Sequence, residues 1–172
     1  MCDGSRPVLA WRGKYIEVSR SGSWEYVGRV AGIDAAVILA LTDAREIVLV
    51  EQHRVPLGRR TIELPAGLIG DETSGEAPAL AAARELYEET GFTAADWRDC
   101  GEFATSPGMS SEMFRLFKAT RLTRTGRGGG VENEHIVVHV VELAGLAEWL
   151  ESRRAAGLVI DCRLVAALGL VP

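Results

Sequence analysis

Apolar and polar residues alternate over short stretches in the first third of the chain. Alternation with a period of two is typical of strands that bury one face. Residues that favour turns, such as Gly, Ser and Asp, separate these stretches. The pattern therefore predicts a series of hairpin-connected strands, at KYIEVSR, WEYVGRV, DAAVILAL, EIVLVEQ and RTIELPAG.

The rest of the chain mixes predicted strands with predicted helices. Further strands are expected at GEFAT, MFRLFKAT and HIVVHVVEL, and helices at LAEWLESRRAAG and DCRLVAALGL. The glycine-rich stretch TGRGGG lies between two of these strands and is expected to form a flexible loop. Many strands with a few helices between and after them favour a mixed sheet covered by helices, in a single α/β or α+β domain.

The clearest helix is predicted from Pro78 to Thr90. Proline suits the first turn of a helix, and Gly91 suits the left-handed residue that ends one. At about 100° per residue, one stripe of this helix is expected to face the core, made of Ala79, Ala82, Ala83, Leu86 and Thr90. A separate arc, away from that stripe, holds Glu85, Glu88 and Glu89.

This arc of glutamates has two open interpretations. Neighbouring carboxylates on one helix face repel each other by about a few tenths of a kcal/mol per pair, so positive charge is expected nearby. The first interpretation is a solvated acidic surface, partly offset by Arg84. The second is a site for a hard divalent cation, because Mg²⁺ and Mn²⁺ prefer clustered carboxylate oxygens.

Composition limits the classes of function. With 172 residues, 47% hydrophobic and 25% charged, the chain has the size and apolar content of one globular domain. A net charge of -5 disfavours nucleic acid as the main partner. Cys2, Cys100 and Cys162 are too far apart for a zinc motif and are expected to be reduced thiols. No signal peptide or membrane-spanning run is visible, so a cytoplasmic protein without membrane contact is expected.

The predicted helix and the loop before it carry a spaced set of residues. Gly70 is followed after five residues by Glu76, and after seven more by RELYEETGF, from Arg84 to Phe92. This set resembles the complete signature of the Nudix hydrolases, with every constrained position met. The resemblance implies a Nudix-type α/β/α sandwich with a mixed sheet, and hydrolysis of a nucleoside diphosphate linked to another group. It also implies a bound Mg²⁺, which Mn²⁺ can replace.

The same resemblance implies a role for each matched residue. The implied metal ligands are Glu85, Glu88, Glu89 and the backbone carbonyl of Ala66 in LPAG. Arg84 would orient these carboxylates through ion pairs, and Glu76 would support the geometry of the loop. Gly70 and Gly91 would have backbone roles, in a turn and at the helix end.

A second resemblance narrows the family. Pro107, in TSPGMSSE, lies fifteen residues after Phe92 and resembles a mark of the ADP-ribose pyrophosphatase subfamily. The segments VEQHRVPLGRRTIELPAGLI, ENEHIVVHVV and WEYVGRV also resemble that subfamily. The implied substrate is ADP-ribose or a similar nucleoside diphosphate sugar, cleaved to AMP and ribose 5-phosphate. GDP-mannose as the substrate, and a non-catalytic module that binds nucleotide sugars, stay open as alternatives.

This subfamily resemblance also assigns residues that bind substrate. Trp24 would stack on adenine across a homodimer interface, and Tyr15 is a weaker candidate for the other side of the base. Arg54 matches a position that contacts substrate, where a guanidinium suits phosphate, and Glu112 matches one near the terminal ribose. The alternatives are core or interface packing for Trp24 and a surface charge for Arg54. The chain would then divide into a dimer-forming strand segment, residues 1–30, and a Nudix domain, residues 31–172.

The general base would come from the acidic loop after the glycines. Glu132 aligns best with the base of the resembled subfamily, and Glu134, two residues away, stays open. Both could instead be surface charges of the loop. In that case the base would be Glu88 or Glu89.

Overall fold

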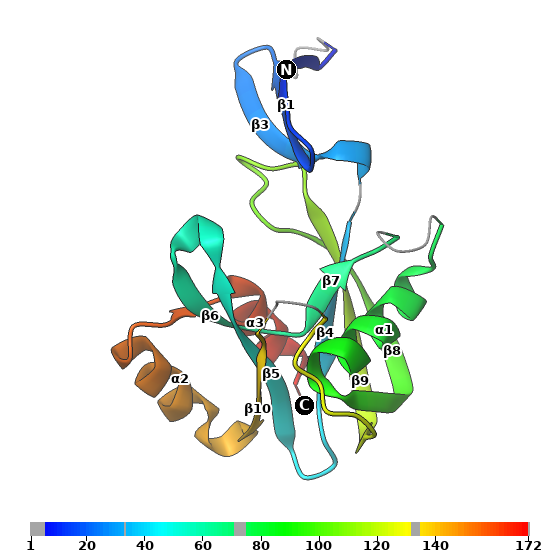
Figure 1. The fold of residues 1–172 in the computed structure, drawn as a ribbon, viewed down its shortest axis with the longest axis vertical. Coiled ribbons are helices and arrows are strands. Elements are labelled where there is room, and N and C mark those ends of the chain that lie inside the picture. Colours follow the sequence, from blue (N-terminus) through cyan, green and yellow to red (C-terminus); the bar gives the residue numbers. More distant parts are fainter. Residues whose placement is uncertain (1–5, 33, 71–74, 132–134, 172) are drawn as a thin grey trace.

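A computed structural model describes residues 6–32, 34–70, 75–131 and 135–171 of the chain. These residues form three sheets, and helices pack against the two sheets of the main body (Figure 1). The helices are α1 (Pro78–Thr90), α2 (Leu146–Ala155) and α3 (Cys162–Ala167), with short 3₁₀ helices η1 (Val30–Gly32), η2 (Val55–Leu57), η3 (Leu143–Gly145) and η4 (Leu168–Leu170). Within these ranges, no helix is both long and apolar enough to cross a membrane.

A three-stranded antiparallel sheet comes first and projects from the rest of the molecule at the top of Figure 1. Its strands are β1 (Val8–Arg12), β2 (Ile16–Ser21) and β3 (Trp24–Arg29). The sheet contacts the main body through Val27, whose N–H donates to the carbonyl of Met109 and whose carbonyl accepts from the N–H of Ser111, both at 2.9 Å. The expected N-terminal antiparallel strands are therefore confirmed, while their use in dimerisation and a boundary after residue 30 stay predictions.

The main body contains two four-stranded mixed sheets. The first has the order β7-β4-β9-β8, with β7 (Ala66–Leu68), β4 (Ala35–Ala40), β9 (Met113–Arg124) and β8 (Phe92–Ala104). The second has the order β10-β5-β6-β11, with β10 (Val137–Glu142), β5 (Glu46–Arg54), β6 (Arg59–Glu63) and β11 (Val159–Ile160). Each sheet has one parallel pair, β4 with β9 and β6 with β11, and its other pairs are antiparallel.

Strand β4 lies at the centre of the layers, because all six of its residues are buried. Val37 and Leu39 pack in a core cluster with residues of β5, β6, α2 and α3. Ala36 and Ile38, on the opposite face, pack in a second cluster with α1. Burial of each such aliphatic side chain contributes about 1.5–3 kcal/mol. Helices therefore cover the sheets from both sides, which confirms the expected α/β sandwich.

Helix α1 has the bounds expected from the sequence, but the expected burial of its faces is partly wrong. Gly91 ends it with φ of 74°, and its N–H donates to the carbonyl of Tyr87 at 2.8 Å. Ala79, expected in the core, is exposed, whereas Glu85 and Glu89, expected away from the core, are buried. The cause lies in β7, where a Cβ on Gly67 would come within 2.0 Å of the carboxylate carbon of Glu85. A glycine there makes room for the carboxylate beneath the sheet.

The glycine-rich stretch after β9 packs against the C-terminal end of α1. The N–H of Gly129 donates to the carbonyl of Glu89 at 2.8 Å, and the N–H of Gly130 donates to the carbonyl of Glu88 at 3.0 Å. A Cβ on Gly128 would lie 2.4 Å from the backbone of Thr90. The sequence predicted a flexible loop here, but these glycines allow a close approach that satisfies the last carbonyls of the helix.

Candidate active site

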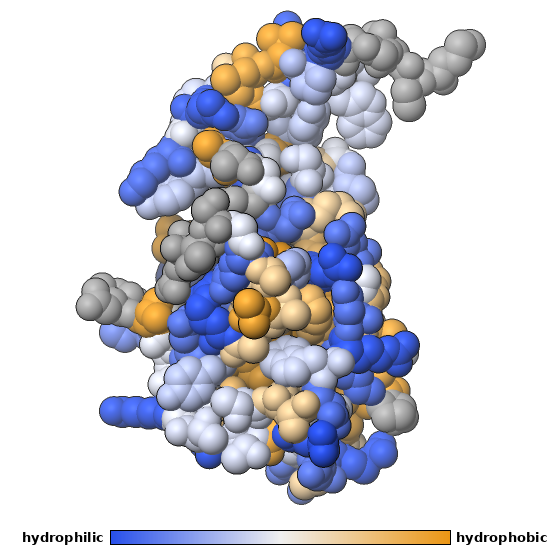
Figure 2. Space-filling view, turned by 90° about the vertical axis from the view of Figure 1, so that its right-hand side faces the viewer, coloured by the Kyte–Doolittle hydropathy of each residue, from blue (hydrophilic) through white to orange (hydrophobic). Residues whose placement is uncertain are grey.

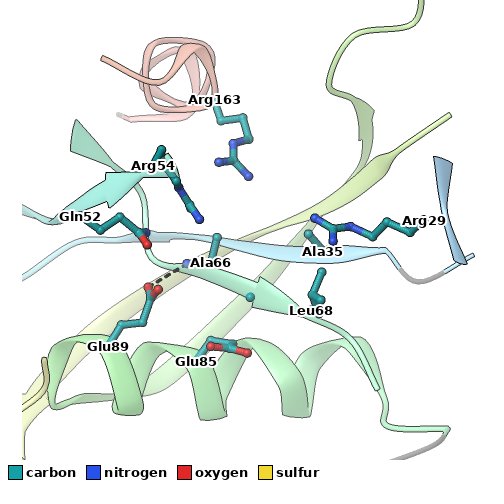
Figure 3. A pocket seen from close by; sticks show the side chains of 10 residues that line it. Arg29, Ala35, Gln52, Arg54, Ala66, Leu68, Glu85, Glu89 and Arg163 are labelled. Carbon is teal, nitrogen blue, oxygen red and sulfur yellow. Dashed lines mark hydrogen bonds between the residues drawn. The ribbon is translucent and has the colours of Figure 1, made fainter. Parts of the chain in front are cut away.

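A hollow of about 320 Å³ lies between α1 and β7 on one side and the end of β5 and α3 on the other. Acidic and basic side chains enter it from opposite directions: Glu85 and Glu89 from α1, and Arg54 and Arg163 from β5 and α3 (Figure 3). The residues that line it are Arg29, Ala35, Gln52, Arg54, Ala66, Gly67, Leu68, Glu85, Glu89 and Arg163. This arrangement suits a ligand that carries negative charge together with a cation.

The acidic wall is formed by two glutamates one helical turn apart. Glu85 is 8% exposed and Glu89 is 5% exposed. The N–H of Ala66 donates to Oε2 of Glu89 at 3.0 Å, which ties the helix to β7 (Figure 3). Burial of two carboxylates of the same sign is unfavourable unless cationic groups compensate them.

Arg84 compensates part of this charge. Its Nη1 donates to Oε1 of Glu85 at 2.8 Å and to Oε2 of Glu88 at 3.1 Å. The guanidinium thus holds two of the three predicted metal ligands, of which Glu85 lines the hollow and Glu88 does not. This geometry supports the prediction that Arg84 orients the carboxylates.

The other end of the Arg84 guanidinium fixes the loop before the helix. Its Nε donates to Oε1 of Glu76 at 3.2 Å, and this hydrogen bond raises the pKa of Arg84 and lowers the pKa of Glu76. Glu76 also accepts the N–H of Gly70 at 3.2 Å, where the backbone turns with φ of 82°. Glu76 and Gly70 therefore lie where a supporting role requires them, although those roles stay predictions.

The basic wall is built around one buried acid. Glu63 is 2% exposed and accepts two hydrogen bonds from Arg54, Nε to Oε1 at 2.7 Å and Nη2 to Oε2 at 2.6 Å. Nη2 of Arg163 donates to the same Oε2 at 3.2 Å. The hydrogen bond to Glu63 raises the pKa of Arg54. The two guanidiniums can therefore lie close together without uncompensated repulsion.

A third arginine reaches the hollow from the N-terminal sheet. Arg29, at the end of β3, donates from Nε to Oε1 of Glu112 at 2.7 Å. Glu112 was expected near the terminal ribose of a substrate. In the structure Arg29 lines the hollow, and Glu112 forms an ion pair with Arg29 without lining the hollow itself. The contact of Glu112 with substrate stays a prediction.

Other predicted residues lie away from this hollow or outside the described residues. Trp24 and Tyr15 are 60% and 67% exposed on the N-terminal sheet, and Pro107 is exposed in the loop before β9. Glu132 and Glu134 lie outside the described residues. Sequence reasoning identified Arg54 but missed Arg29, Gln52 and Arg163. Arg29 and Gln52 lie in segments that resemble the subfamily but were given no role, and no motif marks Arg163, which only tertiary packing brings to the hollow.

The NUDIX domain matches residues 32–159, which is most of the chain. The chain belongs to the Nudix family. An ADP-ribose pyrophosphatase of Mycobacterium tuberculosis (strain ATCC 25618 / H37Rv) is 45% identical over 93 residues, 54% of this chain and 44% of that protein. A GDP-mannose pyrophosphatase of Cronobacter sakazakii (strain ATCC BAA-894) is 35% identical over 146 residues, 80% of this chain and 72% of that protein.

A solved structure supports the Nudix fold. The crystal structure of an ADP compounds hydrolase superposes with a TM-score of 0.65 at 23% identity, over 85% of this chain and 83% of that one. The resemblance read from the sequence is thereby confirmed at the level of family and fold. The chain spans about half the length of several curated relatives that it matches.

The donor groups of the Nudix site fit a hard cation. Among described residues, no three His, Cys, Asp or Glu side chains are arranged as a complete metal cluster. Oxygen donors nevertheless dominate the acidic wall, and oxygen is the donor that Mg²⁺ and Mn²⁺ prefer. The three arginines of the hollow also face five carboxylates, Glu63, Glu85, Glu89, Glu112 and Asp161. An anionic ligand would therefore meet net negative charge unless a cation accompanied it.

Proposed function

We propose that this Nudix protein is a Mg²⁺-dependent pyrophosphatase that hydrolyses ADP-ribose, or a similar nucleoside diphosphate sugar, to AMP and ribose 5-phosphate. The observation that carries the proposal is the hollow itself, where the buried carboxylates of the Nudix helix face arginines from three other elements. The 45% sequence identity with an ADP-ribose pyrophosphatase over 93 residues supports the choice of substrate.

Glu85, Glu88, Glu89 and the carbonyl of Ala66 would hold the metal. When bound, Mg²⁺ or Mn²⁺ supplies positive charge that neutralises the phosphate oxygens of the substrate. Arg84 orients Glu85 and Glu88 through its hydrogen bonds. Glu88, held by Arg84, would have to turn toward the hollow to join the other ligands.

Arg54 and Arg29 would bind the diphosphate of the substrate. The Arg54 side chain is 40% exposed while both Nε and Nη2 are held by Glu63, so it presents a fixed positive charge to the hollow. A guanidinium fixed in this way loses little conformational entropy when it binds phosphate oxygens. Arg29 can contribute from the opposite end of the hollow (Figure 3).

The chemical step consumes one water molecule. Its oxygen forms a bond to one phosphorus, and the bond from that phosphorus to the bridging oxygen breaks. A carboxylate takes the proton released by the attacking water, and we assign this role to Glu132, with Glu134 as the alternative. Positioning and neutralisation of charge supply most of the catalysis in phosphoryl chemistry of this kind.

GDP-mannose is the second candidate substrate. The GDP-mannose pyrophosphatase matches 80% of this chain, a larger share than the ADP-ribose pyrophosphatase of M. tuberculosis. A non-catalytic binding module is less favoured, because the Nudix signature is intact and its carboxylates are buried in the hollow.

A panel of nucleoside diphosphate sugars and dinucleotides, incubated with the protein and Mg²⁺, tests the proposal. We expect ADP-ribose to give AMP and ribose 5-phosphate by mass spectrometry. Excess chelator should abolish turnover, and added Mg²⁺ or Mn²⁺ should restore it, because the buried carboxylates repel an anionic substrate. Undiminished turnover in chelator would refute the metal requirement, and preference for GDP-mannose would favour the second substrate.

We also propose a homodimer formed through the N-terminal sheet. Figure 2 shows exposed apolar side chains on this sheet at the top of the molecule, and the exposed residues include Val8, Leu9, Trp11, Ile16 and Trp24. Exposed apolar surface on a projecting sheet favours association. Trp24 is exposed and does not line the hollow of its own chain. It would therefore stack on the adenine of a substrate bound in the hollow of the second chain.

Trp24→Ala is expected to raise KM for ADP-ribose about tenfold or more, with kcat little changed. Stacking of a base on an aromatic ring contributes about 1–3 kcal/mol to ground state and transition state alike. Val140→Ala, at an exposed apolar position of β10 outside the N-terminal sheet, is the control and should leave KM unchanged. Sedimentation should show a dimer for all three proteins. A parent protein that is monomeric at micromolar concentration yet fully active would contradict the dimer.

A further inference from the structure

Arg163 is the residue of the hollow that enters from the C-terminal helix. It lies in the first turn of α3, and its guanidinium faces Glu85 and Glu89 across the hollow, beside Arg54 (Figure 3). The position is distant in sequence from the Nudix signature, and no motif marks it. Its role therefore has to be inferred from its contacts.

Two carboxylates hold this guanidinium. Asp161 accepts the backbone N–H of Arg163 at 2.7 Å, which caps α3, and accepts Nε at 2.8 Å as well as Nη2. Glu63 accepts Nη2 at 3.2 Å. The Arg163 side chain is 20% exposed. Nε and Nη2 are thus fixed from behind, and the orientation of the planar group is set before any ligand arrives.

The arrangement suits binding better than stability. Buried ion pairs contribute little net stability, because the cost of desolvating both charges offsets their attraction. Here Glu63 serves two arginines at once, and both arginines line a hollow instead of filling the core. Two adjacent guanidiniums suit two adjacent phosphates, since the hydrogen bonds above use Nε and Nη2 of each arginine and leave Nη1 to donate to phosphate oxygens.

We propose that Arg163 binds the diphosphate of the substrate together with Arg54, and that Asp161 is the positioning residue that orients it. The inference rests on the proposed function for the identity of the substrate. It assigns the C-terminal helix a direct part in the site and makes Glu63 the shared support of a pair of phosphate-binding arginines.

Arg163→Gln is expected to lower kcat/KM for ADP-ribose about 10–100-fold, as for the loss of a charge-assisted hydrogen bond. It should weaken competitive inhibition by inorganic pyrophosphate, measured with Mg²⁺, by a similar factor. Arg163→Lys should recover part of both losses, because it keeps the charge but loses the planar guanidinium that Asp161 and Glu63 orient. Trp24→Ala should leave pyrophosphate inhibition unchanged, since pyrophosphate has no base.

Arg59→Gln is the matched control. Arg59 donates from Nε and Nη2 to the carbonyl of Gly157, at 3.1 and 2.6 Å, so it anchors the same C-terminal segment without lining the hollow. Its loss should leave both kcat/KM and pyrophosphate inhibition within about twofold of the parent. Asp161→Asn keeps a good helix cap but removes the charge that orients Arg163, so it should raise KM several-fold.

These variants separate the outcomes. If Arg163→Gln and Arg163→Lys both leave KM and pyrophosphate inhibition unchanged, or if Arg59→Gln causes an equal loss, the proposal for Arg163 is overturned and the proposed function survives. If the parent hydrolyses no nucleoside diphosphate sugar, the proposed function fails. Calorimetry of pyrophosphate binding to parent and Arg163→Gln then decides on Arg163 alone, and equal binding or none overturns it. Thermal melting of each variant identifies any that fails to fold.

Discussion

Glu89→Gln is expected to reduce kcat on ADP-ribose by about 10³-fold or more. Glu89 is 5% exposed, lies on the acidic wall and is a predicted metal ligand. A metal that neutralises phosphate charge contributes several kcal/mol to the transition state, and about 1.4 kcal/mol corresponds to a factor of ten in rate. Glutamine removes the charge that holds the metal while it keeps nearly the same volume.

The fold should survive this substitution, because the amide oxygen of glutamine can still accept the N–H of Ala66 that Glu89 accepts at 3.0 Å. Thermal melting should therefore stay within a few degrees of the parent. Glu148→Gln, at an exposed position of α2, removes the same charge far from the hollow and serves as the control. An active Glu89→Gln protein with an unchanged requirement for Mg²⁺ would show that Glu89 is not a ligand.

The sequence predicted those elements whose limits depend on local chemistry. Helix α1 begins at Pro78 and stops before Gly91 because proline suits a first turn and glycine a left-handed end. Strand β4 was predicted because a short run typical of strands, DAAVILAL, lies between residues that favour turns, and the structure shows it buried on both faces. In each case the signal lies within the element itself.

Elements stabilised by distant partners were predicted only in part. Strand β8 runs from Phe92 to Ala104, yet only its last residues were expected as a strand. The polar stretch ADWRDC lacks the alternation typical of a strand, so the sequence did not predict it. It is a strand because it pairs with β9, from Phe92↔Arg124 to Ala104↔Met113. The missing signal was the pairing, which no local pattern encodes.

The site shows the same division. Glu85, Glu89 and Arg84 were found because the spaced signature places them on one helix. The orientation of that helix depends on Gly67 of β7, so the burial of the two glutamates could not be read from the helix alone. Arg163 reaches the hollow only because Asp161 and Glu63 hold it there, and a single arginine near a C-terminus carries no signal of its own.

The assignment of the general base depends on a segment that follows glycines bound to the end of the Nudix helix. Glu132 and Glu134 lie outside the described residues, so their positions in the sequence carry the assignment. The described residues beside them, Gly129 and Gly130, donate to the carbonyls of Glu89 and Glu88. The N–H of Ile136 donates back to the carbonyl of Gly129 at 3.3 Å. The described residues on either side of the two glutamates are thus linked to the end of α1, Gly129 and Gly130 directly and Ile136 through Gly129.

Glu132→Gln is therefore expected to lower kcat by about 10²–10⁴-fold, the usual span for general-base catalysis. Binding of Mg²⁺ and of ADP-ribose, measured by calorimetry, should stay near the parent's, because the substitution leaves the predicted ligands intact. Glu134→Gln is the matched control and should be mild. If Glu134→Gln loses activity instead, the base is Glu134, two residues further along the same loop. If both single variants and the double variant stay within a few-fold of the parent, the base is elsewhere, and Glu88 or Glu89 of the Nudix helix becomes the candidate.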